Sequence, residues 1–101
     1  MREDDWADLV ERFTDGEVTR GHMFGCPGLR TGRRFFTIRW EEQLVLKLPA
    51  ARIADLVQAG GGTPFEPMEG RRMNGWILLT GAADTTSLVE QARAYVTEQH
   101  A

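Results

Sequence analysis

Several residue types are scarce in this 101-residue chain, and each scarcity excludes a class of protein. A single cysteine, Cys26, cannot form an internal disulfide, which excludes a disulfide-stapled secreted domain and favours a reducing compartment. No apolar run approaches the roughly 20 residues that span a bilayer, and the acidic N-terminal segment is unlike the basic start of a signal peptide. We therefore expect a cytoplasmic protein without a membrane segment.

Histidine is also scarce, which leaves few groups for metal or nucleophilic chemistry. A zinc site generally needs four ligands, whereas His22, Met23 and Cys26 supply at most three in one region, and His100 lies near the end of the chain. A nucleophile such as Ser87 or Cys26 would need an oriented base, and no triad can be drawn with either histidine. We expect no metal, no cofactor and no catalytic residue. Cys26 is interpreted as a small turn residue, with a reactive thiol as the alternative.

Lysine is nearly absent, because Lys47 is the single lysine among twelve basic residues. A GC-rich genome explains this bias, and so does bidentate anion binding by arginine. The net charge of −3 gives no general attraction to nucleic acid, yet arginines gather beside two glycine turns that we expect at the same end of a sheet. Ordinary solvated charge is the interpretation we favour. The alternative is a contact for an anion or nucleic acid made by Arg30, Arg33, Arg34, Arg71 and Arg72.

The length and the apolar content indicate one compact domain. A chain of 101 residues is near the modal size of a single domain, and 42% hydrophobic residues suffice for a core without a structural metal or disulfide. We therefore assign residues 1–101 to one domain.

Apolar periodicity predicts three helices. The spacing of Trp6, Leu9, Val10 and Phe13 marks one helical face, with Asp4 or Asp5 as N-cap and an end near residue 16. A second helix begins after Pro49 and ends at the glycines 60–62. A third follows Asp84 as N-cap, and its apolar face is formed by Leu88, Ala92, Tyr95 and Val96.

Alternating or continuous apolar segments predict five strands, at residues 18–24, 36–40, 44–48, 65–68 and 74–80. Residues 25–28 read as a turn, because proline and glycine favour reversals there. In the second strand, Phe36, Ile38 and Trp40 are expected on one face, with Thr37 and Arg39 on the other. Glu41 and Glu42 then form a hairpin turn.

The resulting order is α-β-β-β-α-β-β-α, which is typical of an α+β fold. We expect a two-layer α/β sandwich in which helices cover one face of a mainly antiparallel sheet. The other face is then uncovered, and an uncovered apolar face commonly pairs with another protein. We therefore expect a homodimer or a protein partner.

These segments also carry a resemblance to a known family. The sequence resembles the N-terminal domain of the TfoX/Sxy family over nearly the whole chain, and the resemblance rests on Met23-Phe24-Gly25, Gly28-Leu29, Gly32, Phe35-Phe36, residues 44–49, Pro64-Phe65, Gly70-Arg71 and Trp76. It implies a fold similar to secretion chaperones and YjbR-like proteins. It offers no catalytic residues, and Arg34 stands where a lysine is common in the family.

The family takes its name from regulators of natural competence, in which a helical C-terminal domain follows this one. We see no such second domain in the 101 residues, which weakens any transfer of the competence role through the resemblance. We expect a non-catalytic regulatory or protein-interaction domain. The alternative is an accessory domain that binds nucleic acid through the arginines named above, and strong salt dependence of binding would separate the two.

Overall fold

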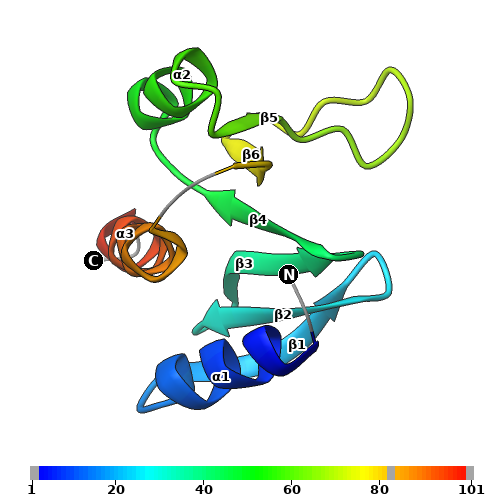
Figure 1. The fold of residues 1–101 in the computed structure, drawn as a ribbon. Helices are drawn as coiled ribbons and strands as arrows, with labels where there is room; N and C mark the ends of the chain where they lie inside the picture. Colours follow the sequence, from blue (N-terminus) through cyan, green and yellow to red (C-terminus); the bar gives the residue numbers. More distant parts are fainter. Residues whose placement is uncertain (1–2, 82–83, 100–101) are drawn as a thin grey trace.

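The structure is a computed structural model that describes residues 3–81 and 84–99. Over these residues three helices accompany a six-stranded antiparallel sheet (Figure 1). The elements in chain order are α1 (Glu3–Phe13), β1 (Val18–Met23), β2 (Cys26–Thr31), β3 (Arg34–Trp40), β4 (Gln43–Lys47), α2 (Ala50–Gln58), β5 (Gly62–Pro64), β6 (Trp76–Leu79) and α3 (Thr85–Gln99). The predicted α+β class is confirmed, although the order gains one strand and becomes α-β-β-β-β-α-β-β-α.

The additional strand is β2, which the sequence analysis assigned to a turn. The reversal is confined to Phe24 and Gly25, and β2 then pairs antiparallel with β1 from Cys26 onward. Pro27 is tolerated in this strand because the register with β3 begins only at the next residue, where Gly28 faces Ile38. The missing N–H of proline therefore interrupts no bond of that ladder.

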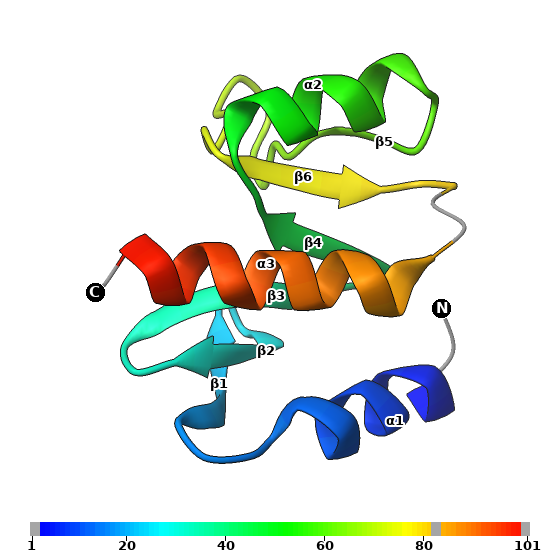
Figure 2. The same ribbon diagram turned by 90° about the vertical axis from the view of Figure 1, so that its left-hand side faces the viewer.

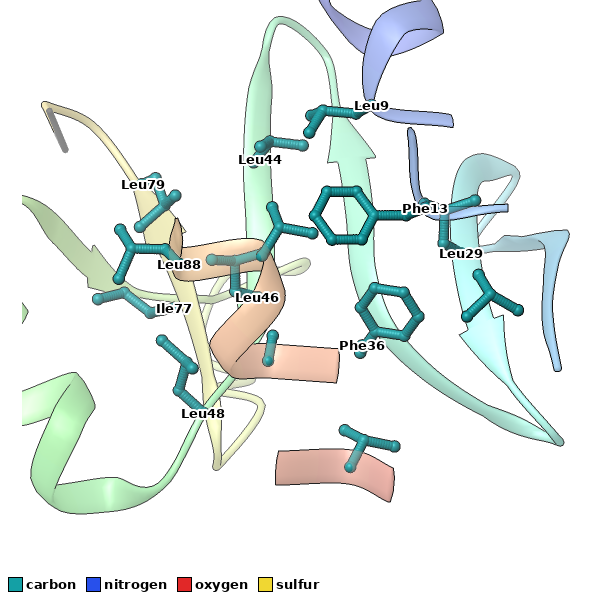
Figure 3. Close-up of a cluster of buried hydrophobic side chains, with 14 of the residues drawn as sticks. Leu9, Phe13, Leu29, Phe36, Leu44, Leu46, Leu48, Ile77, Leu79 and Leu88 are labelled. Carbon is teal, nitrogen blue, oxygen red and sulfur yellow. The ribbon is translucent and has the colours of Figure 1, made fainter. Parts of the chain in front are cut away.

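The strands follow the order β1-β2-β3-β4-β6-β5, and all three helices lie on one side of the sheet. Figure 2 shows α3 crossing in front of the sheet, with α2 above it and α1 below it. The side chains that point to these helices form one large cluster, called here the helical-side core (Figure 3). Its buried members are Trp6, Leu9, Phe13, Val18, Leu29, Phe36, Leu44, Leu46, Leu48, Leu56, Ile77, Leu79, Leu88, Val89, Ala92 and Val96.

A β-bulge in β3 overturns the expected facing of its side chains. Leu29 pairs with Thr37 and Arg30 pairs with Phe35, so Phe36 is an extra residue of β3 that has no partner in β2. Thr37 shares its face with Leu29, and Phe36 belongs to the same helical-side core. Ile38 and Trp40 lie on the opposite face, so the strict alternation predicted from Phe36 to Trp40 is wrong.

The face opposite the helices is not bare, which corrects the expectation of an uncovered sheet. Residues 65–75 connect β5 to β6 and run on the far side of the sheet from the helices (Figure 1). Phe65 is buried there, and its ring meets that of Trp40 edge to face at 5.0 Å between centroids. The buried members of this opposite-face cluster are Ile38, Val45, Phe65 and Trp76.

One of the two predicted helix N-caps is confirmed. Asp84 caps α3 as predicted, because its Oδ1 accepts a hydrogen bond of 3.0 Å from the Ser87 backbone N–H. Asp4 and Asp5 do not cap α1, since the helix begins at Glu3 and contains both. The short edge strand is β5 at Gly62–Pro64 rather than residues 65–68. None of the described helices is long and apolar enough to cross a membrane.

Candidate interaction groove

An open, mainly apolar groove lies between α2 and residues 72–76, the segment that leads into β6. Its volume is about 550 Å³. The lining residues are Ala50, Ile53, Ala54, Val57 and Gln58 from α2, Pro64 from β5, and Arg72, Met73, Asn74, Gly75 and Trp76.

The first wall of the groove is α2, a short amphipathic helix whose apolar side chains are only partly buried by the rest of the domain. Pro49 precedes the helix with φ −59° and ψ 148°, which suits a helix start where a missing N–H costs nothing. Leu56 is the one described residue of α2 that is buried, whereas Ile53 is half-buried and Val57 is 38% exposed. The apolar flank of α2 beside Leu56 is therefore exposed to solvent.

The facing wall is held in place by backbone hydrogen bonds, although it has no regular secondary structure. Met73 donates its N–H to Phe65 O at 2.9 Å, and Leu48 donates its N–H to Gly75 O at 3.1 Å. Trp76 begins β6 and is buried in the opposite-face cluster. Because Met73 and Gly75 are hydrogen-bonded to the residues that directly follow β5 and β4, we expect the groove to keep its shape without a ligand.

The charges at the groove are positive. Arg72 is the only charged residue among the described ones that line it. Its Nε lies 3.7 Å from Glu66 Oε1, and the two side chains are 60% and 45% exposed, so this ion pair contributes little. The Lys47 ammonium lies 5.7 Å from the ring centroid of Trp76, on the strand paired with β6.

The structure places the predicted arginine patch at one end of the sheet, but in two separate groups. Arg33 and Arg34 lie exposed at the turn between β2 and β3, whereas Arg71 and Arg72 lie in the segment before β6. β3 and β6 both pair antiparallel with β4, which lies between them, so the two strands begin at the same end of the sheet, as expected. No described contact joins the two groups, and Arg72 alone lines the groove.

Arg30, the fifth arginine of that set, contacts other residues of the sheet. Arg30 Nε donates to Thr19 Oγ1 at 3.3 Å, and its guanidinium carbon lies 6.0 Å from the ring centroid of Phe35. Arg30 thus covers an aromatic ring of the face opposite the helices. Arg39 also lies in β3, where its Nε donates to Glu41 O at 3.1 Å.

Cys26 and His22, the cysteine and the histidine that the structure describes, do not converge on a metal site, and His100 lies outside the described residues. Cys26 is half-buried at the start of β2, packs against the opposite-face cluster and has its Sγ 3.8 Å from Phe24 O. His22 is exposed on β1. Within residues 3–81 and 84–99, no group of three or more histidine, cysteine or acidic side chains could hold a metal ion.

The prediction of a helix between Pro49 and the glycines 60–62 did not reveal the groove. A signal was present, because Ala50, Ile53, Ala54 and Val57 follow the i, i+3, i+4, i+7 spacing of a second flank of the same helix. Alanine is only weakly hydrophobic, so this flank is a weak signal in the sequence. The facing wall of the groove is about twenty residues further along the sequence, and only the fold brings the two walls together.

Comparison with known proteins gives one family and no individual relative. Neither the curated proteins nor the solved structures contain a significant match. The model of the TfoX N-terminal domain matches residues 8–98, nearly the whole chain. The fold described above and this match agree with the resemblance of the sequence motifs, and the chain belongs to the TfoX N-terminal domain family.

Proposed function

We propose that this chain is a non-catalytic protein-interaction domain, and that the groove between α2 and residues 72–76 holds an apolar segment of a regulatory partner. The observation that carries this proposal is the groove itself. It combines half-buried or exposed apolar side chains, Ile53, Val57 and Met73, with the edge of an otherwise buried aromatic ring, Trp76.

Burial of such surface is the main driving force of protein association. Each square ångström of apolar surface removed from water contributes about 25 cal/mol, although part of that gain offsets the loss of motional freedom on binding. Tryptophan and methionine are enriched at the centres of protein interfaces, and α2 offers small alanines on which a second helix can pack closely. A groove of this kind is typical of the recognition of an amphipathic segment.

The test uses a displayed library of helix-forming peptides of 14 residues with large apolar residues on one face, selected on the wild-type protein. Peptides from the selection are resynthesised, labelled and measured by fluorescence anisotropy. Ala54 lines the groove, whereas Ala51 is exposed on the same helix outside it. We expect Ala54→Arg to weaken binding by at least roughly tenfold, because it places a charge in the apolar groove, and Ala51→Arg to leave it within about twofold.

The proposal is wrong if no peptide is enriched, or if the selected peptides bind Ala54→Arg as well as wild type. Light scattering of the free protein tests whether the occupant of the groove is a second copy of this chain. A dimer that dissociates in Ala54→Arg but persists in Ala51→Arg would make the occupant a second copy of this chain. Thermal unfolding of both variants verifies that each is folded, which is expected because both positions are solvent-accessible.

A second candidate function, nucleic-acid binding, is favoured by the exposed pair Arg33 and Arg34 at the β2–β3 turn. We expect a double substitution to alanine to abolish DNA retention in mobility-shift assays, and retention itself to fall between about 50 and 200 mM salt. The control is Arg12→Ala with Arg52→Ala, two arginines of the helical layer. Retention that survives the Arg33 and Arg34 double substitution would remove this candidate.

A further inference from the structure

We infer that the segment held by the groove is an acidic amphipathic helix, and that Arg72 selects it by pairing with a carboxylate. The inference rests on the proposed function and adds the chemical class of the partner. It follows from the shape of the groove, the secondary structure beside it and the distribution of charge over the molecule.

The shape matches about two turns of a helix. α2 contributes lining residues at each of its turns, from Ala50 through Ile53 and Ala54 to Val57 and Gln58. At a rise of about 1.5 Å per residue, this wall is about 12 Å long. An amphipathic helix laid along it would place apolar residues at i, i+3 or i+4, and i+7 against the wall.

An extended strand fits the groove less well than a helix. The strand nearest the groove is β5, which has three residues, and its lining member Pro64 has no N–H to donate to an added strand. α2 packs against β5 and covers that margin of the sheet. The main-chain hydrogen bonds on which strand addition depends are therefore lacking at Pro64.

The charge of the groove calls for a negative partner. Arg72 lines it, and the Lys47 ammonium is near Trp76, while no acidic residue is among the described lining residues. Glu66 competes for Arg72 only through a solvent-exposed pair at 3.7 Å. A carboxylate from a bound helix would meet the guanidinium beside apolar surface, where a charge-assisted hydrogen bond is stronger than in open water.

Three acidic residues lie on the elements that form the groove, Asp55 on α2 and Glu66 and Glu69 in segment 65–75, but none of the three lines it. The other twelve acidic residues belong to other parts of the chain. Five of them stand within the first eleven residues, and α1 lies at the far end of the molecule from α2 (Figures 1 and 2). A basic helix would meet Arg72 and Lys47 as like charges, so the same two residues that attract an acidic segment disfavour a basic one.

The experiment repeats the peptide selection with the positions outside the apolar face free to be Asp, Glu, Lys, Arg or Ser. We expect the enriched peptides to carry an excess of acidic over basic residues. Arg72→Glu should weaken such a peptide roughly tenfold, a change of about 1.4 kcal/mol, and should improve binding of its lysine-substituted counterpart. Arg71→Glu is the matched control, since Arg71 is the exposed neighbour outside the lining, and should change affinity less than about twofold.

The outcomes separate this inference from the function on which it rests. Peptides that lose binding in Ala54→Arg but show no acidic excess, or that ignore Arg72→Glu, would overturn the inference and leave the groove as an interaction site. Equal effects of Arg72→Glu and Arg71→Glu would also overturn it, since they would indicate only long-range charge. Absence of any groove-dependent peptide would overturn both.

Discussion

The two faces of the sheet are buried in different ways. Among the residues that the structure describes, sixteen buried ones form the helical-side core, drawn from all three helices and five of the six strands, whereas four form the opposite-face cluster. Regular helices close the first face, and the irregular segment 65–75 covers the part of the second face around Ile38, Val45 and Trp76. The helical-side core therefore holds most of the stability, while the segment that covers part of the other face also forms a wall of the groove.

The exposed large apolar residues follow this division only in part. Phe24 and Met68, the two most exposed among the described residues, lie in the β1–β2 turn and in segment 65–75, whereas Val57 lies on α2 of the helical layer. Residues of low local stability are commonly those that bind, because a site built on a fully packed face has no surface left to bury. The predictions below test whether the two faces differ in this way.

The largest expected effect comes from removing one phenyl ring from each face. Phe36 and Phe65 are both almost completely buried, one in each cluster. Phe36→Ala should cost about 4 kcal/mol, because α3 and the strands around it cannot close the cavity. Phe65→Ala should cost less, about 3 kcal/mol, because an irregular segment can move into part of the space left by the ring. Denaturant unfolding of both variants measures the difference.

Hydrogen exchange adds a local readout to that comparison. In Phe65→Ala we expect faster exchange in residues 65–76 with little change in α3, whereas Phe36→Ala should speed exchange throughout. Equal costs, or loss of protection in α3 in both variants, would mean that the two faces fold as one unit and that the division drawn here is wrong.

A smaller effect of opposite sign is expected at Thr37, which lies on the helical side of the sheet. Its side chain is fully buried beside Leu29 and Leu46, and its Oγ1 has no hydrogen-bond partner in the structure. Thr37→Val replaces the hydroxyl by a methyl of similar size and should stabilise the fold by about 1 kcal/mol. This corresponds to a rise in Tm of about 4–8 °C for a domain of this size.

Thr37→Ser separates the hydroxyl from the methyl group. It keeps the unpartnered oxygen and loses a buried methyl, so its Tm should fall. If Thr37→Val lowers Tm as well, the hydroxyl has a partner in solution and the packing of this face depends on it.

The sequence predicted the helices and most strands, because each carries a local period that survives folding. Trp6 to Phe13 and Leu88 to Val96 show the helical spacing, and Leu44, Leu46 and Leu48 recur at the two-residue spacing of one face of a strand. β2 was missed because Pro27 and Gly28 favour a turn, and only its position in the register makes them tolerable. The groove and the two separate arginine groups depend on which distant segments meet, which no local period records.

The smallest expected change in stability is a gain from replacing Phe24, the exposed aromatic residue at the tip of the β1–β2 hairpin. Phe24 has φ +56° and Gly25 has φ +75°, the positive values that both central residues of a type I′ turn require. A phenylalanine is strained there and is also 58% exposed, whereas asparagine adopts this conformation readily. Phe24→Asn should therefore raise the free energy of unfolding by on the order of 0.5 kcal/mol.

Phe24→Leu is the matched control for this last prediction, because it keeps an apolar side chain in the same strained backbone and should give no gain. Thermal unfolding in parallel measures both. A loss of stability in Phe24→Asn would show that the ring packs on the opposite-face cluster in solution, through Met23 or Cys26 beside it in the hairpin. That result would extend the opposite-face cluster to the hairpin tip and narrow the contrast between the two faces.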